Sequence, residues 1–384
     1  MKRKVIYADH AATTQLAPKA LEAMLPFLRS EYGNPSSLYS FSRLPQMAVK
    51  TARQTIALAI NAKENEIFFT SGGSESNNWV LKGLAFEPHR KDERKHIITS
   101  AIEHHSVLNA VNDLKRLGFD VTMLPVNKFG EIEEEVFCNA ICPETICISI
   151  MYANNEIGTI QNIPALARIA RRYRVPFHTD AVQVAGHLPL DVKKLKVDFM
   201  SASAHKFNGP KGIGFLYIRK GMKLSNLISG GDQEQGRRAG TENVAAILGM
   251  AEALKIHSIH MHENVKHISQ LSTRFRNELQ RTIPFAQFNG SPDHCLPGIV
   301  SVSFPGLNGE ALMHLLDLKS GVIVSTGSAC NSQKKQPSHV LKAIKLSTKN
   351  AKGTIRVSFA HENTVSDVNA VVRAIAFAVN ASLR

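Results

Sequence analysis

The chain has 384 residues, of which 43% are hydrophobic and 20% are charged, as in ordinary folded proteins. No apolar run approaches the length of a membrane span, and the first residues lack the apolar core of a signal peptide, so we expect neither. The 46 Lys and Arg residues exceed the 32 Asp and Glu residues by 14, a balance that suits an acidic partner such as nucleic acid or an acidic protein.

The positive charge has a second interpretation, a solubilising charge without a partner. The basic residues are spread along the chain, without interleaved aromatic residues or a nucleic-acid motif, so direct nucleic-acid binding is not the expected function. Five cysteines in so long a chain do not make a disulfide framework. This cysteine usage favours a reducing cytoplasm.

Short apolar stretches alternate with helical patterns between about residues 66 and 217. A helix is expected over 163–173, and strands over 67–70, 96–99, 120–123, 145–150, 175–179 and 197–201. This alternation predicts an α/β protein with a mostly parallel sheet covered by helices. In such sheets ligands bind at the carboxyl ends of the strands.

The remainder of the chain predicts a smaller α/β domain. One long helical stretch is expected over 244–282, with its histidines on the solvent face; further strands and helices follow at 298–304, 309–318, 353–359 and the end of the chain. We therefore expect a large domain at 15–255 and a small domain built from 1–14 and 256–384.

A carboxylate and a lysine follow two neighbouring strands of the predicted sheet. Asp180 comes directly after 175–179, and Lys206 comes five residues after 197–201. A pyridoxal phosphate (PLP) enzyme needs this pair, because the lysine amine holds the aldehyde as a Schiff base and the carboxylate keeps the pyridine nitrogen protonated. The pair predicts a PLP site.

The turn after the first strand of this sheet is suited to an anion. Gly72, Gly73 and Ser74 stand between a strand and a helix, where glycines let backbone amides approach a phosphate and the helix N-terminus adds positive potential. A plain strand–helix turn with serine caps is the alternative. The downstream lysine favours a phosphate cradle.

Three further polar residues follow predicted strands. His104 could stack on a pyridine ring and exchange protons with substrate, although its neighbour His105 leaves a metal site as a weaker alternative. Asn155 could bond the phenolic oxygen of PLP or the substrate carboxylate. Gln183, one helical turn after Asp180, could bond the same oxygen without adding charge.

Two residues of the second half are candidates with open alternatives. Cys330 lies in a run of small polar residues with Gly and Pro, near Lys334 and Lys335, so it is either a nucleophile of lowered pKa or a surface cysteine without a task. The fork of Arg356 suits a substrate carboxylate, but a lone arginine is more often structural. Cys138, Cys142 and Cys147 are more typical of a core than of a metal site.

The chain resembles the cysteine desulfurases of the NifS/IscS type, within the fold-type I PLP enzymes of aminotransferase class V. The resemblance covers almost the whole chain. Its motifs lie at 7–14, 32–37, 70–78, 103–104, 154–158, 178–183, 203–206, 209–212, 238–241 and 327–330. The last of these, Gly327-Ser328-Ala329-Cys330 in a long loop, is the most specific and resembles the group whose active cysteine lies on a long loop.

This resemblance implies a role for each matching position. Lys206 would carry PLP, Asp180 would pair with its ring nitrogen, and His104 would stack on the ring. Gln183 and Asn155 would address the phenolic oxygen and the substrate, and Arg356 the substrate carboxylate. Cys330 would take the sulfur of L-cysteine as a persulfide. The phosphate would be held by Gly73, Ser74, Ser203 and His205, and by Thr241 of the other subunit of a homodimer.

Several functions remain open at this stage. A selenocysteine lyase or another PLP enzyme related to aminotransferases is the nearest alternative, and a non-catalytic basic scaffold is the alternative from another class. The sulfur acceptor is also open: an iron–sulfur scaffold, or an enzyme that thiolates tRNA or DNA. Tyr39 to Ser42 and the basic segment 333–336 depart from the family pattern, which leaves the choice of partner open.

Overall fold

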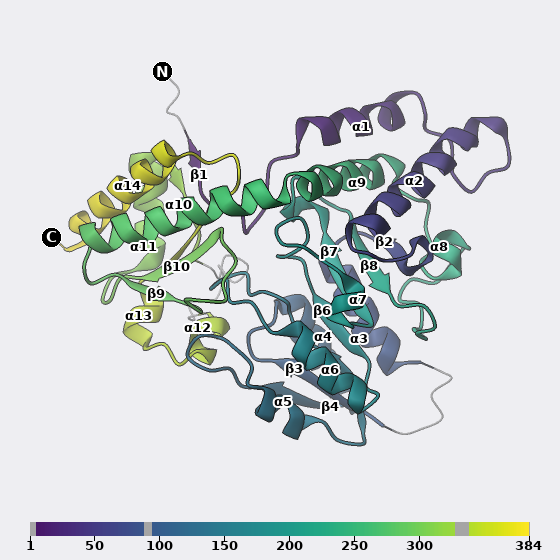
Figure 1. The fold of residues 1–384 in the computed structure, drawn as a ribbon, viewed down its shortest axis with the longest axis horizontal. Helices are drawn as coiled ribbons and strands as arrows, with labels where there is room; N and C mark the ends of the chain where they lie inside the picture. Colours follow the sequence, from purple (N-terminus) through teal and green to yellow (C-terminus); the bar gives the residue numbers. More distant parts are fainter. Residues whose placement is uncertain (1–4, 88–93, 327–337, 384) are drawn as a thin grey trace.

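The computed structural model describes residues 5–87, 94–326 and 338–383. Within these ranges, the largest sheet has seven strands in the order β2-β8-β7-β6-β5-β3-β4 (Figure 1). Among these strands, β8 alone runs in the direction opposite to the other six. The strands are β2 (Ile67–Thr70), β3 (His96–Ser100), β4 (Asp120–Leu124), β5 (Thr145–Ser149), β6 (Phe177–Asp180), β7 (Phe199–Ser203) and β8 (Gly214–Ile218).

Helices cover both faces of this sheet because successive strand side chains point to opposite faces. In β2, Ile67 and Phe69 join a core with α2, α6 and α9, whereas Phe68 joins a second core with α3 and α4. The helices in this first part of the chain are α1 (Pro18–Arg29), α2 (Arg43–Ala59), α3 (Gly73–Ala85), α4 (His105–Arg116), α5 (Glu134–Ala140), α6 (Ile163–Arg172), α7 (Val192–Leu195), α8 (Gln233–Gly236), α9 (Val244–Ile259) and α10 (Met261–Thr282).

A second, antiparallel sheet has the order β12-β10-β9 and packs with α10 and α14 around a core of its own. The N-terminal strand β1 (Ile6–Tyr7) pairs with β11 (Val322–Ile323), so the chain start lies beside the C-terminal part. The division into 15–255 and 1–14 with 256–384 stays a prediction. The remaining elements are β9 (Gln287–Asn289), β10 (Ile299–Ser303), α11 (Gly309–Leu315), α12 (His339–Ala343), α13 (Thr348–Lys352), β12 (Thr354–Ser358) and α14 (Val365–Leu383).

The predicted α/β class and the predicted strands are confirmed, whereas the single helix over 244–282 is wrong. The chain leaves helical geometry at His260, where α9 ends and α10 begins. The two helices have different surroundings: α9 is buried on most sides, and α10 buries one face. The expectation that all the histidines face solvent also fails, because His257 is buried and its ring bonds Gly186 O and Asn208 Oδ1.

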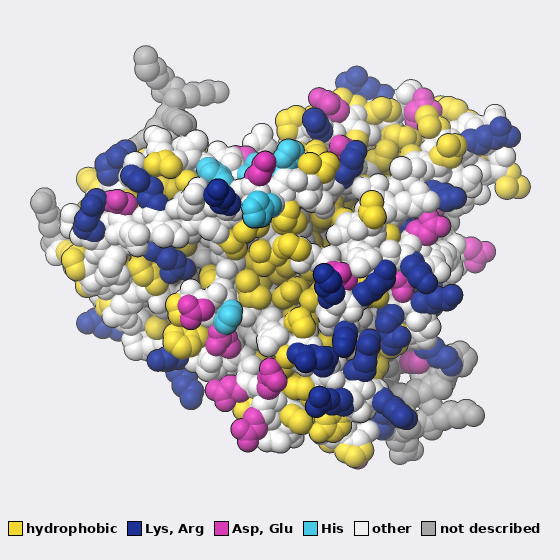
Figure 2. Space-filling model, viewed as in Figure 1, with side chains coloured by type: hydrophobic (Ala, Val, Ile, Leu, Met, Phe, Trp, Pro, Cys, Tyr) yellow, Lys and Arg dark blue, Asp and Glu magenta, His cyan; other side chains and the backbone are white. Residues whose placement is uncertain are grey.

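The helices and the surface charge were also compared with the expectations from composition. Among the described residues, no helix is long and apolar enough to span a membrane. The positive charge is unevenly distributed: Lys and Arg side chains gather over α6 and α7, as the dark blue atoms of Figure 2 show.

The core around the second sheet depends on Phe275 of α10, which is fully buried and meets Phe359 edge to face at 5.5 Å between ring centroids. We predict that Phe275→Ala lowers the free energy of unfolding by about 3–5 kcal/mol, through lost burial and the cavity that remains. The matched control is Phe377→Ala on α14, where the ring is 55% exposed, with an expected change of about 0.5 kcal/mol. Equal shifts of the urea midpoint, followed by circular dichroism, would contradict this packing.

Candidate active site

A cavity of about 270 Å³ opens at the carboxyl edge of the large sheet, where the loops after β2, β3, β5, β6 and β7 meet. It brings together residues from seven separate segments of the chain. Ten predicted site residues line it: Gly73, Ser74, His104, Asn155, Asp180, Gln183, Ser203, His205, Lys206 and Arg356. Thr241 is exposed and lies outside this lining, so its predicted role in a second subunit stays a prediction. Cys330 lies outside the described residues.

Lys206 ends a short 3₁₀ turn after β7 and extends its amine toward the N-terminal segment. Its Nζ donates to the carbonyls of Ala11 at 2.7 Å and Ala12 at 2.8 Å. The Gln183 amide donates to the same Ala11 carbonyl at 3.1 Å. The N-terminal segment therefore positions both the lysine and the glutamine at the cavity.

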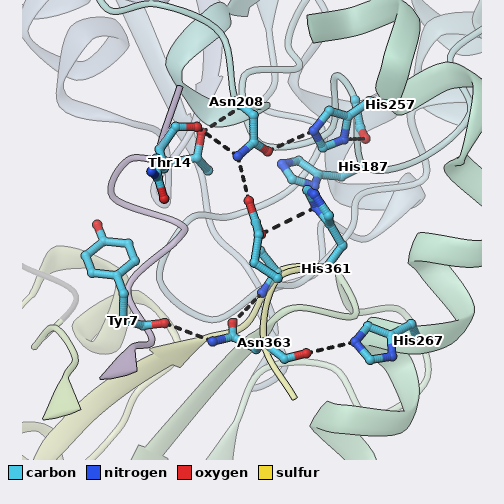
Figure 3. A network of polar contacts seen from close by, with 12 residues as sticks. Tyr7, Thr14, His187, Asn208, His257, His267, His361 and Asn363 are labelled. Carbon is cyan, nitrogen blue, oxygen red and sulfur yellow. Dashed lines mark hydrogen bonds and ion pairs between the residues drawn. The ribbon is translucent and has the colours of Figure 1, made fainter. Parts of the chain in front are cut away.

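A polar network holds the backbone of the lysine segment (Figure 3). Thr14 Oγ1 donates to the His205 carbonyl at 2.9 Å and accepts from the backbone N–H of Asn208 at 2.7 Å. The ring of His187 bonds the Lys206 carbonyl at 2.8 Å. Asn208, in the left-handed region at φ 60°, donates to Glu362 Oε1 at 2.7 Å. The lysine is thus fixed by contacts to distant parts of the chain.

The Asp180 carboxylate is buried at the end of β6 and is held by two N–H donors. The Asn77 amide donates to Oδ2 at 2.7 Å, and the Val182 backbone amide donates to Oδ1 at 2.9 Å. Asn77 also donates to Ser106 Oγ at 2.9 Å, which ties the first turns of α3 and α4 together. These bonds fix the direction in which the carboxylate faces the cavity.

His104 caps the N-terminus of α4 and has one defined tautomer. Its Nδ1 accepts from the Ser106 backbone amide at 3.1 Å, so in the neutral ring the proton is on Nε2. Burial lowers the pKa of His104, while the nearby Asp180 carboxylate opposes this shift and Lys206 adds to it. The cavity therefore contains a neutral imidazole at physiological pH that can donate and accept protons.

Glu103 lies fully buried beneath His104. Burial raises the pKa of its carboxyl to about 8, although Ser100 Oγ and the Met151 amide both donate to Oε1, and Asp180 raises it further. Its Oε2 has no hydrogen-bond partner among the described residues. Glu103 is therefore protonated at neutral pH, beside the Asp180 carboxylate.

The turn between β2 and α3 leaves room for an anion and for no larger side chains. Gly72 has φ +149°, a conformation that favours glycine, and a Cβ on Gly73 would lie 2.5 Å from Val182 Cγ2. The first amides of α3 have no partner within the helix. An adjoining cavity of about 360 Å³ shares Gly73, Ser74, Ser203 and His205 with the first. This donor set suits a phosphate.

Arg356 reaches the cavity from β12 of the second sheet. Its Nη2 donates to Asp9 Oδ1 at 2.6 Å and its Nη1 to the Asn155 carbonyl at 2.7 Å. These bonds use two of its five N–H groups, and the buried Nε has no partner among the described residues. Arg356 is thus both a structural contact and a remaining donor, so the two sequence interpretations do not exclude each other.

The described ends of the segment that contains Cys330 attach beside this cavity. Before it, Ser325 pairs with Arg356 through two backbone hydrogen bonds. After it, Ser338 Oγ donates to Glu156 Oε2 at 2.5 Å, and the ring of His339 bonds the Glu103 carbonyl at 2.9 Å. Glu156 and Glu103 directly neighbour the cavity residues Asn155 and His104.

Comparison with known proteins defines the class. The family model described as aminotransferase class-V matches residues 6–371, and the chain belongs to this family, which uses PLP. The family recognised from the sequence motifs is thereby confirmed. The cavity fits the cofactor in its donors: an amine for the aldehyde, a fixed carboxylate for the ring nitrogen, and a cradle for the phosphate.

Individual relatives narrow the comparison. The chain is 48% identical over 369 residues to a protein of Dictyoglomus turgidum named cysteine desulfurase IscS, covering 96% of this chain and 93% of that relative. A solved structure described as a NifS-like protein superposes with a TM-score of 0.91 at 37% identity, covering 97% and 99% of the two chains. Another, described as SspA in complex with cysteine, has a TM-score of 0.82 at 38% identity, covering 93% and 99%.

Sequence reasoning missed the residues that support the site. Asn77 and Glu103 stand inside motifs that were recognised, but their partners Asp180 and Met151 are distant in the chain. Thr14 also stands inside a recognised motif, at 7–14, but its partners His205 and Asn208 are distant in the chain, and Asn208 itself has no local signal. Only their position against Lys206 identifies them as supports.

The protonated Glu103 predicts a pH dependence of stability. An unfolded chain loses this proton near pH 4.5 and the native protein near pH 8, so the native state binds an extra proton between these values. The free energy of unfolding therefore falls as pH rises through this window, by at most about 1.4 kcal/mol per pH unit. We predict that Glu103→Gln removes this component, measured by urea unfolding at pH 5, 6.5 and 8.

The matched control is Glu22→Gln, an exposed glutamate on α1. The difference in free energy of unfolding between Glu22→Gln and the wild type should be the same at pH 5, 6.5 and 8. If the difference in free energy of unfolding between the wild type and Glu103→Gln also stays constant with pH, Glu103 is ionised in the native protein and the prediction is wrong.

Proposed function

We propose that this protein is a PLP-dependent cysteine desulfurase that converts L-cysteine to L-alanine and keeps the sulfur as a persulfide on Cys330. One observation carries the proposal: Lys206, Asp180 and His104 line a single cavity in a chain that is similar over nearly its whole length to named cysteine desulfurases. The solved relative that contains cysteine supports the choice of substrate. L-cysteine and PLP are therefore the expected ligands.

The residues of this chain divide the chemistry between them. When bound, PLP supplies a ring that accepts the electrons of the substrate Cα–H bond. Asp180, fixed by Asn77 and Val182, would keep a proton on the ring nitrogen. Lys206 Nζ would hold the cofactor and then remove the Cα proton. The Nε2–H of His104 would move protons between the thiol groups and the substrate.

The substrate would be oriented by Asn155 and Arg356. Nη1 and Nη2 of Arg356 are already fixed by the Asn155 carbonyl and by Asp9, which makes the remaining N–H groups a rigid donor set for the substrate carboxylate. Because Arg356 comes from the second sheet and Lys206 from the first, substrate binding would join the two parts of the molecule.

The sulfur step transfers one sulfur atom between thiols. Cys330 as a thiolate would attack the substrate Sγ, the substrate Cβ–Sγ bond would break, and two protons would complete alanine. L-cysteine and the Cys330 thiol thus give L-alanine and the Cys330 persulfide, without an external oxidant or reductant. Cys330 follows Thr326 by four positions, and four residues can extend about 14 Å. Because Ser325 pairs with the cavity residue Arg356, this reach supports attack within the cavity.

The proposal includes a subunit arrangement, a cellular location and a sulfur acceptor. The exposed position of Thr241 and the family resemblance support a homodimer in which Thr241 completes the phosphate site of the partner. The described cysteines form no disulfide, which supports a cytoplasmic location. A sulfur acceptor, either an iron–sulfur scaffold or a thiolation enzyme for tRNA or DNA, would receive the persulfide.

We predict that Cys330→Ala keeps PLP but forms alanine and sulfide at least about 100-fold more slowly, because the attacking thiolate is lost. Alanine and sulfide are measured from L-cysteine with a thiol reductant. The matched control, Cys138→Ala on α5, should retain the parental rate. Alanine formation by Cys330→Ala at the parental rate would rule out Cys330 as the nucleophile.

We predict that Lys206→Ala loses the absorption band, at the edge of the visible range, that lysine-bound PLP gives, because Lys206 is the one lysine that lines the cavity among the described residues. Absorption spectra of purified protein, with and without added PLP, measure this directly. Wild-type protein that stays colourless after incubation with PLP would contradict the proposal.

Product analysis separates the alternative functions. Formation of 2-oxo acids in place of alanine would favour an aminotransferase, and strong preference for selenocysteine would favour a selenocysteine lyase.

A further inference from the structure

Seven exposed basic side chains gather on one face of the molecule. Four arginines come from α6 and the residues after it, and three lysines come from α7 and the residue after it (Figure 2). The two helices pack beside each other, and α6 buries its opposite, apolar face in the core. We call this face the α6–α7 basic surface: Arg168, Arg171, Arg172, Arg174, Lys193, Lys194 and Lys196.

This surface is separate from the site already described. Arg174 precedes β6 and Lys196 precedes β7, so the surface lies at the amino edge of the parallel strands, whereas the cavity opens at their carboxyl edge. A strand of five residues spans roughly 17 Å. The basic surface therefore has no part in binding the cofactor or the amino acid.

Few carboxylates balance this charge. In the described part of the chain, one ion pair involves the seven side chains, with Lys194 Nζ at 3.9 Å from Asp191 Oδ2. Asp191 also caps α7 by accepting from two backbone amides, and Lys193 Nζ donates to the uncharged Asn61 side chain. The surface therefore presents a dense positive potential to solvent.

The composition of the surface favours phosphodiesters over an acidic protein. Arginine forks match phosphate geometry, and four of the seven side chains are arginines. A protein interface needs apolar anchors at its centre. In 163–174 and 192–196, the one exposed large hydrophobic residue is Tyr173, which is 50% exposed between Arg172 and Arg174.

A groove of about 330 Å³ adjoins the same residues and gives the surface a shape. Arg168, Arg172 and Tyr173 form one wall, and Cys138 and Glu134 of α5 form the other. One acidic side chain at the far wall would direct a polyanion toward α6. We expected scattered charge without interleaved aromatic residues, but Tyr173 lies between two arginines. The packing of α6 beside α7, which gathers the charge on one face, was not predicted.

We propose that the α6–α7 basic surface binds the phosphodiester backbone of a nucleic acid without reading its sequence. Because the surface is remote from the cavity, the nucleic acid would dock there, and the nucleotides bound at the surface would not themselves receive the sulfur. This binding does not depend on the proposed function, since it requires neither PLP nor cysteine.

The experiment measures fluorescence anisotropy of labelled 20-base-pair duplexes, one of DNA and one of RNA, with the full-length PLP-loaded protein at increasing NaCl. The test variant combines Arg171→Gln, Arg172→Gln and Lys194→Gln. The matched control combines Lys342→Gln, Lys349→Gln and Lys352→Gln, three exposed lysines on α12 and α13. Poly-L-glutamate of equal charge is the competing probe, and cysteine turnover of each variant checks folding.

Losing three phosphate contacts should flatten the slope of log K against log salt by about 2.7 and weaken duplex binding at least about tenfold at low salt. The control variant should bind like the wild type, and both variants should keep parental cysteine turnover. The stronger of the DNA and RNA arms identifies the source of the phosphodiester. Absence of wild-type binding, an equal loss in the control, an unchanged test variant, or tighter binding of poly-L-glutamate would overturn the proposal.

Discussion

The placement of one amine constrains much of this molecule. Lys206 Nζ is held by the carbonyls of Ala11 and Ala12, and the backbone around it is held by Thr14, His187 and Asn208. Because a buried donor or acceptor without a partner costs about 1–3 kcal/mol, these bonds favour one arrangement of the segments. The N-terminal segment is therefore held against the residues that follow β7, and β1 of the same segment pairs with β11 of the C-terminal part.

The electrostatics of the cavity follow from the same closeness. Two carboxyl groups, Glu103 and Asp180, lie in a poorly solvated region, and burial keeps the proton on Glu103. Asp180 is held by N–H donors, and the positive charge of Arg356 is balanced by Asp9.

The two edges of the large sheet have different characters. The carboxyl edge gathers the side chains that suit a cofactor and an amino acid, whereas the amino edge carries an excess of arginine and lysine at α6 and α7. In a parallel sheet these edges are separated by the strand length, so a surface partner and a substrate can bind at the same time. The net positive charge of the chain is thus partly concentrated where it cannot disturb the cavity.

The sequence by itself determined the α/β class, the strands from β2 to β7, the family, and ten of the residues that line the cavity, because strand periodicity and motif residues at strand ends are local signals. It did not predict the break at His260, the buried role of His257, or the support that Asn77, Glu103 and Asn208 provide. The buried role of His257 and the support from Asn77 and Asn208 depend on contacts between residues from about 50 to more than 150 positions apart. Likewise, basic residues scattered in the chain became one surface only when α6 packed beside α7, since the sharing of a face by two helices is decided by tertiary packing and not by their spacing.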